Sequence, residues 1–217
     1  MSLLDDIQAG IIYILQTLPD SLITGITVLA VLLGNQSLFT VAASSIFMQA
    51  LVTGIGYLVI RFNPDSAITR SSQEPCTAGY INNYWAQVRG GRNNTDHPYA
   101  PSLYMATVSF FAGWGTGLKQ LYADEINQGV LSNAQSITFL VLAFVIVLIA
   151  MVARIRSQCE SLFGALIGVG TGLAIGYLAC IAIGAATGRT ATNIWGMPLL
   201  RDRITNGSPI YTCPKTE

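Results

Sequence analysis

The three longest apolar stretches of the chain contain no charged residue, and they limit the possible fold more than any other feature. They are residues 38–60, 136–153 and 161–187. A helix of about 20 apolar residues is needed to cross the hydrocarbon core of a membrane. A helix on the surface of a soluble domain would instead show one polar face. The stretches therefore predict an all-α fold, a polytopic bundle of transmembrane helices.

Two further segments extend this bundle. Residues 21–34 are apolar but short for a full span, and residues 102–118 are rich in small residues, which favour close helix packing in lipid. With them the chain has four or five predicted spans, in a membrane domain at 20–188. Residues 35–37, Asn-Gln-Ser, are expected to form a tight turn between two of the spans.

The first 19 residues have a different pattern. Leu3, Ile7, Ile11 and Ile14 fall on one face of a helix, and the acidic residues fall elsewhere. This predicts an amphipathic interfacial helix at 1–19, which Pro19 ends or kinks. The first half of a kinked spanning helix is an alternative interpretation. The N-terminus carries acidic rather than basic residues, so we expect no cleaved secretory signal.

Two polar segments flank the later spans. Residues 62–100 form a predicted extramembrane loop, and a loop of this length is typically either functional or disordered. Its aromatic residues argue against disorder. Residues 189–217 contain three prolines and predict an extended C-terminal arm. We expect the loop and the arm to contact other protein subunits, in addition to the lipid around the bundle.

Charge and cysteine content exclude several classes of function. The chain has 11 basic and 11 acidic residues, which argues against nucleic acid as a partner. One histidine and four cysteines without a CxxC pair predict no zinc site, and we expect no cofactor. Cys180 is expected in the core, whereas Cys76 lies in the polar loop with no partner fixed. Alternating spans put six basic residues on one side and five on the other, which does not orient the protein.

Two motifs carry a resemblance to a known family. The segments are "YAPSLYMATVSFFAG" at 99–113 and "RIRSQCESLFGALIGVGTG" at 154–172. They resemble the second and third motifs of the type-2 phosphatidate phosphatase superfamily. Pro101 and Ser102 match the second motif, and Tyr104 stands where that motif has a histidine. In the third motif Glu160 replaces an aspartate, and Arg156 replaces the nucleophilic histidine.

The resemblance implies a fold without the family's chemistry. Catalysis in the family uses one histidine as nucleophile and another as acid, and neither is present here. Arg156 stays protonated, and Tyr104 is a poor acid or base at neutral pH. The only histidine, His97, is more simply explained as a loop cap. Pro101 is expected in the first turn of its helix. We therefore predict a protein that is not an enzyme, with Pro101, Ser102, Tyr104 and Glu160 as the remnant of a cleft.

The arginines of this region have two interpretations. A cleft that has lost its chemistry can still hold a lipid phosphate, because arginine binds phosphate in bidentate fashion. The candidates are Arg89, Arg92, Arg154 and Arg156. Alternatively, these arginines flank the spans, extend to the interface and pair with Asp96 and Glu160. Arg156 with Glu160 is the pair that we expect to separate the two interpretations.

Glycines recur at every fourth position of the last span, at Gly164, Gly168, Gly172 and Gly176. A stripe of small residues lets a neighbouring backbone approach closely, so we assign these four residues to helix packing.

The leading functional hypothesis is a non-enzymatic integral membrane protein with a structural or assembly role. A dead phosphatase-like core with ordered arms is similar to the membrane proteins beneath the capsids of large icosahedral DNA viruses. This suggests a virion internal membrane, or a host membrane during assembly; a subunit of an organellar membrane complex has the same features. The alternative is a protein that binds or moves phospholipid through the arginine-lined cleft. A channel or transporter is disfavoured, because the spans contain almost no ionisable residues.

Overall fold

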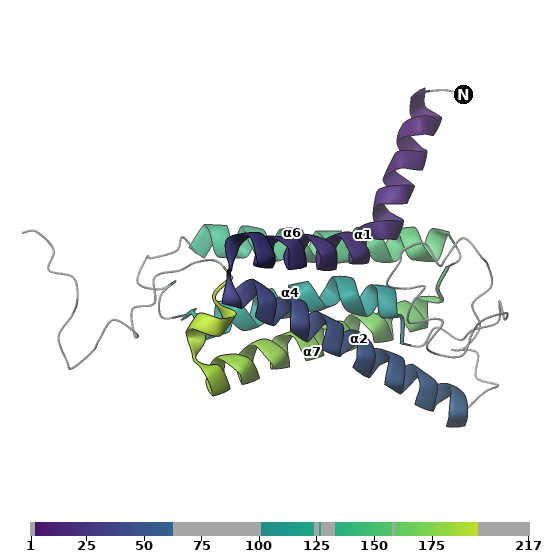
Figure 1. Cartoon of the computed structure of the whole chain (residues 1–217). Helices are drawn as coiled ribbons and strands as arrows, with labels where there is room; N and C mark the ends of the chain where they lie inside the picture. Colours follow the sequence, from purple (N-terminus) through teal and green to yellow (C-terminus); the bar gives the residue numbers. More distant parts are fainter. Residues whose placement is uncertain (1–2, 63–100, 124–125, 127–132, 158, 195–217) are drawn as a thin grey trace, which may run out of the picture.

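The computed structural model describes residues 3–62, 101–123, 126, 133–157 and 159–194. All regular elements in these ranges are helices, which confirms the predicted all-α class. Five α-helices and one short 3-10 helix form an elongated bundle (Figure 1). Residues 63–100 of the predicted loop 62–100 and most of the arm 189–217 lie outside the described residues, so the assignments made for them stay predictions; Phe62 itself is the last residue of a helix.

The first helix, α1, runs from Leu3 to Leu33 and contains Pro19. Its second part lies along the bundle, whereas its first part turns sharply away from it (Figure 1). Proline removes a backbone donor and clashes with the preceding turn, which accounts for a bend near this position. The boundary expected at residue 19 is thus a kink within one helix. The first part has the direction that an interfacial helix would take if the bundle axis crosses the membrane.

A tight turn joins α1 to α2, which spans Gln36–Phe62. Gly34 has φ of 58°, a left-handed conformation that glycine adopts without strain. The side-chain oxygen of Asn35 accepts hydrogen bonds from the backbone N–H groups of Ser37, at 2.8 Å, and Leu38, at 3.3 Å. Asn35 therefore caps α2. The turn expected at 35–37 lies instead at Gly34 and Asn35, because the Asn35 cap lets the helix begin at Gln36.

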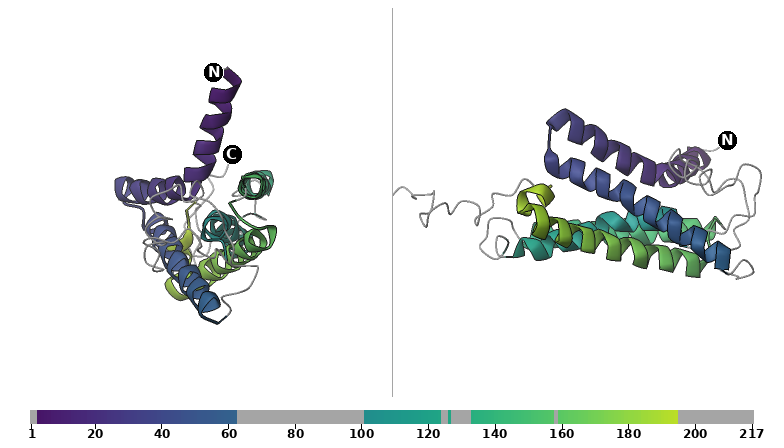
Figure 2. Two further views of the ribbon diagram at one scale, coloured as in Figure 1. Left: turned by 90° about the vertical axis from the view of Figure 1, so that its right-hand side faces the viewer. Right: turned by 60° about the horizontal axis from the view of Figure 1, so that its bottom comes forward.

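Helix α4, Leu103–Leu121, occupies the centre of the bundle. Fourteen of its residues are buried, and the end-on view shows it enclosed by the other helices (Figure 2). Its hydroxyl groups bond to its own backbone, as Thr107 does to the carbonyl of Leu103 at 2.8 Å. These bonds satisfy the hydroxyl groups within the helix itself, so its Ser and Thr residues can be buried.

Among the residues that the structure describes, three helical segments are long and apolar enough to cross a membrane: Gln36–Leu58 of α2, Ser136–Arg156 of α6 and Leu162–Thr187 of α7. Helix α6 spans Asn133–Arg156 and helix α7 spans Leu162–Thr187. Large apolar side chains of α6 point outward, for example Leu142, which is 60% exposed. Exposed apolar side chains on such helices indicate an integral membrane protein. A shorter apolar segment, Thr17–Leu33, adds to them, whereas α4 is shielded by its neighbours.

The helical bundle has two ends that differ in composition. At the end that we name the Cys159 end lie the C-terminus of α2, the N-termini of α4 and α7, and the turn between α6 and α7 (Figure 1). At the other end, named the η3 end, lies a 3-10 helix, η3, over Arg189–Thr192. The arm predicted to be extended from residue 189 therefore starts with a helical turn. The carbonyl of Thr190 accepts a hydrogen bond from Ser37 Oγ at 2.7 Å, which fixes η3 against α2.

Candidate functional site: a buried polar cluster at the Cys159 end

Glycines allow α4 and α7 to lie nearly in backbone contact. A Cβ atom added at Gly168 would lie 2.7 Å from the carbonyl oxygen of Ser102. One added at Gly172 would collide with the carbonyl oxygen of Ala106 and the hydroxyl of Ser109. Gly164 and Gly176 are also buried on this face of α7. The four-residue stripe thus packs on α4, and it sets the register that brings the start of α4 to the start of α7.

Helix α4 contributes its own glycines, which the sequence analysis did not single out. A Cβ at Gly117 would lie 2.8 Å from Cβ of Cys180, and one at Gly113 would overlap the backbone of Leu173. Gly113 and Gly117 are four residues apart, so the same spacing rule that identified the stripe in α7 would have identified them.

Ser102 begins α4, and Pro101 precedes it. The Ser102 hydroxyl accepts a hydrogen bond from the N–H of Met105 at 3.0 Å, and Ser102 itself is fully buried. The Ser102 N–H donates to the carbonyl of Gly164 at 3.4 Å, which links the starts of α4 and α7. Serine is among the best N-caps, so it takes the cap position. Pro101 therefore lies before the helix, whereas the sequence predicts it in the first turn. The prediction for Pro101 is wrong because Ser102 takes the cap position.

A buried ion pair lies beside this junction. Glu160 Oε1 accepts hydrogen bonds from Arg154 Nε at 3.1 Å and from Arg154 Nη2 at 2.9 Å. The two side chains are only 7% and 2% exposed. The guanidinium carbon of Arg154 lies 4.5 Å from the centre of the Tyr104 ring, and the Tyr104 hydroxyl donates to the carbonyl of Leu15. One polar cluster thus connects α1, α4, α6 and the turn that leads into α7.

Local structure explains why Arg154 rather than Arg156 pairs with Glu160. Two residues on a helix differ by about 200° in direction, so the two arginines point to opposite faces. Arg154 faces the bundle and is buried, whereas Arg156 is exposed. After α6 ends, the N–H of Cys159 bonds to the carbonyl of Arg154 at 3.0 Å, which returns Glu160 toward Arg154. The expected pair of Arg156 with Glu160 is replaced by this one.

The cluster is suited to holding helices together. Arg154 has its guanidinium on a carboxylate and an aromatic face, and Tyr104 has its hydroxyl on a backbone carbonyl. A cation–π contact and a hydrogen-bonded ion pair gain strength when they are desolvated. Within the described ranges, no group of three potential metal-ligating side chains is present. Arg89, Arg92, Asp96 and His97 lie outside the described residues.

The opposite end has a polar contact of its own, which sequence reasoning missed. The Tyr122 hydroxyl, just after α4, donates to the carbonyl of Arg189. The guanidinium carbon of Arg189 also lies over the Tyr122 ring, at 5.9 Å from its centre. A lone Tyr after an apolar helix gives no sequence signal for the contact with Arg189, because its partner is a backbone carbonyl.

A further polar contact lies in the core, where the Gln49 amide is 3.4 Å from the Thr107 hydroxyl.

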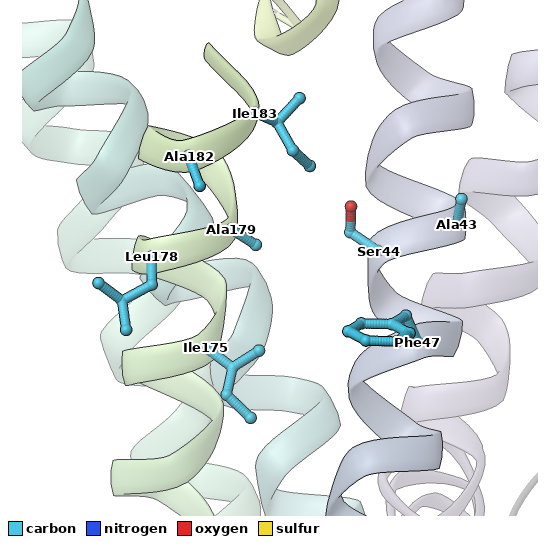
Figure 3. A pocket seen from close by; sticks show the side chains of 8 residues that line it. All are labelled: Ala43, Ser44, Phe47, Ile175, Leu178, Ala179, Ala182 and Ile183. Carbon is cyan, nitrogen blue, oxygen red and sulfur yellow. The ribbon is translucent and has the colours of Figure 1, made fainter. Parts of the chain in front are cut away.

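An apolar groove of about 550 Å³ lies between α2 and α7. Ser44 and Phe47 of α2 face Ile175, Ala179 and Ile183 of α7 across it (Figure 3). Small side chains on both walls leave this space open. The groove lies on the apolar outer surface, away from the polar cluster at the Cys159 end.

Comparison with known proteins gives no relative for this chain. No protein-family model, no curated protein and no solved structure matches it.

Proposed function

We propose that this chain is a non-enzymatic integral membrane protein with a structural or assembly role, built on a phosphatase-like core without catalytic residues. The observation that carries this proposal is the set of contacts that the Arg154 guanidinium makes inside the bundle. A binding site for phosphate would leave its arginine available to the ligand, whereas Arg154 is committed to Glu160 and to the Tyr104 ring. A polar group used in this way positions helices.

The close contact of α4 with α7 also supports a static core. Carriers and pumps move helices past one another, and the glycine contact leaves no room for a side chain between these two helices. The predicted protein contacts of the loop 62–100 and of the arm 189–217 would then be the working surfaces. The setting that we propose for this role is a virion internal membrane or another membrane complex.

Cross-linking mass spectrometry on the native membrane or particle tests the assembly role. Lys119 in the last turn of α4 and Lys215 in the arm supply amines, and acidic-residue chemistry covers the loop. We expect reproducible links to one other protein. Lys119→Arg keeps the charge but does not react, so it must lose the links assigned to that position. Links confined to this chain would contradict the proposal.

A second function, phospholipid headgroup binding, is favoured by one observation. Arg156 lies exposed in the last turn of α6, at the Cys159 end of the bundle, where a span would meet a headgroup layer. Under this alternative, Arg156→Ala weakens binding of phosphatidate in native mass spectrometry, and Arg156→Lys restores part of it. Under the structural proposal, both variants bind lipid as the parent chain does. Vanadate-sensitive phosphate release by purified protein would contradict both.

A further inference from the structure

The Cys159 end of the bundle carries a disulfide. Cys159 lies in the turn between α6 and α7, is 2% exposed and is disulfide-bonded. Cys180 is a free thiol buried in the contact between α4 and α7. The chain has four cysteines, so the partner of Cys159 is either Cys76 or Cys213.

Chain continuity decides between these two cysteines. The segment that contains Cys76 leaves the bundle after Phe62 and returns at Pro101, and both residues lie at the Cys159 end. The segment that contains Cys213 leaves after Ile194, at the η3 end (Figure 1). With the bundle across a membrane, Cys213 would have to carry a polar segment through the bilayer to reach Cys159, which is strongly disfavoured. Cys76 needs no such crossing.

We infer that Cys76 and Cys159 form a structural disulfide, and that the Cys159 end of the bundle therefore faces an oxidising compartment. Disulfides persist in the secretory lumen, the periplasm and the extracellular space, and are rare where thiol reductants operate. The η3 end, with Lys119 and Arg189, then faces the reducing side. Basic residues alone do not orient this chain, whereas the disulfide does.

Formation of the disulfide needs an electron acceptor, which a thiol oxidoreductase of the oxidising compartment supplies. Bond formation removes two protons and two electrons from the Cys76 and Cys159 thiols. Thiol–disulfide exchange passes them to the disulfide of a thiol oxidoreductase, which leaves as a dithiol. The exchange has to precede the final packing of the turn, since Cys159 is buried in the finished fold.

The direction of α1 agrees with this orientation. Its first part leaves the bundle at the Cys159 end and contains Asp5 and Asp6 (Figure 1). The cytoplasmic leaflet carries a negative surface potential, which disfavours an acidic helix lying on it. The opposite leaflet imposes a smaller penalty, so the helix and the disulfide favour the same side.

Peptide mapping tests the bond on the unmodified chain. Free thiols are blocked with N-ethylmaleimide in intact membranes, and the protein is then denatured, purified and digested without reductant. We expect one linked peptide pair that contains Cys76 and Cys159, with its loss on reduction. Cys180 serves as the internal control, because a buried free thiol is alkylated only after denaturation. A maleimide on Cys159, or a link from Cys159 to Cys213, would overturn the inference.

Labelling of two matched helix ends tests the orientation. Phe62 and Leu33 are apolar, 82% and 67% exposed, and lie at the Cys159 end and the η3 end respectively. Phe62→Cys and Leu33→Cys are made singly in a Cys180→Ala, Cys213→Ser background, which keeps the disulfide. In cells whose plasma membrane alone is permeabilised, an impermeant maleimide should label Leu33→Cys, and Phe62→Cys only after detergent opens the lumen; where the protein is at the cell surface, Phe62→Cys should be labelled in intact cells and Leu33→Cys only after permeabilisation. The reverse pattern, or labelling of both variants from one side, would overturn the inference.

Discussion

Arg154 and Glu160 meet across the turn between α6 and α7, with Arg154 Nη2 2.9 Å from Glu160 Oε1. The Arg154 guanidinium lies against the Tyr104 ring, and Glu160 directly precedes Ser161, the N-cap of α7. The pair therefore lies where four parts of the chain meet. Its energetic contribution depends on keeping both charges, because either one alone would be buried without a partner.

Glu160→Ala is expected to destabilise the fold by about 3–5 kcal/mol, the usual cost of leaving one charge of a buried pair uncompensated. The double variant Arg154→Met, Glu160→Leu should recover much of that loss, since it removes both charges and keeps the volume. Arg156→Ala is the control and should change stability by less than about 0.5 kcal/mol, as exposed positions do. Denaturant unfolding in mixed micelles measures all three. Equal losses for Glu160→Ala and Arg156→Ala would contradict the role assigned to the pair.

Gly172→Ala should separate α4 from α7. The added methyl group would overlap the carbonyl of Ala106 and the hydroxyl of Ser109, and the backbone carbonyl cannot move without shifting a helix. We expect a loss of about 2 kcal/mol, in the range for overpacked cores. Gly170→Ala is the matched control: nothing lies within 4 Å of its added Cβ. That variant should be neutral or more stable by up to about 1 kcal/mol, because alanine favours helix. A similar loss in both would exclude the close contact as the cause.

Sequence alone predicted the helices well and the polar contacts poorly. The long uncharged stretches located α2, α6 and α7, because lipid requires a continuous apolar helix and leaves a strong signal. The glycine stripe of α7 indicated a packing face, because small residues at every fourth position let a neighbouring backbone approach closely. Which arginine pairs with Glu160 was not predictable from motif alignment, since it depends on helix phase and on where the turn returns the chain. Nor was the partner of Tyr104, because the carbonyl of Leu15 is a backbone atom that no sequence pattern marks.

Ser161→Ala should weaken the start of α7. The Ser161 side chain accepts a hydrogen bond from the N–H of Gly164 at 3.0 Å, and alanine would leave this donor without its partner. The expected cost is about 1 kcal/mol, typical of a lost N-cap. Ser161→Asn keeps a capping oxygen and should retain most of the stability. Hydrogen exchange at the first turn of α7 should rise in the alanine variant only. Faster exchange in both variants would show that the hydroxyl has another role.

Tyr122→Phe tests the attachment of η3 at the opposite end. The Tyr122 hydroxyl donates to the carbonyl of Arg189 in a partly buried hydrogen bond, so its removal should cost about 1 kcal/mol and loosen η3. Tyr177→Phe is the control, because the Tyr177 hydroxyl donates to Gln120 at an exposed position, where water replaces the lost bond. Limited proteolysis after Arg189 should accelerate in Tyr122→Phe and stay at the parent rate in Tyr177→Phe. If Tyr122→Phe left both stability and cleavage unchanged, then Ser37, which bonds the carbonyl of Thr190, would be sufficient to hold η3.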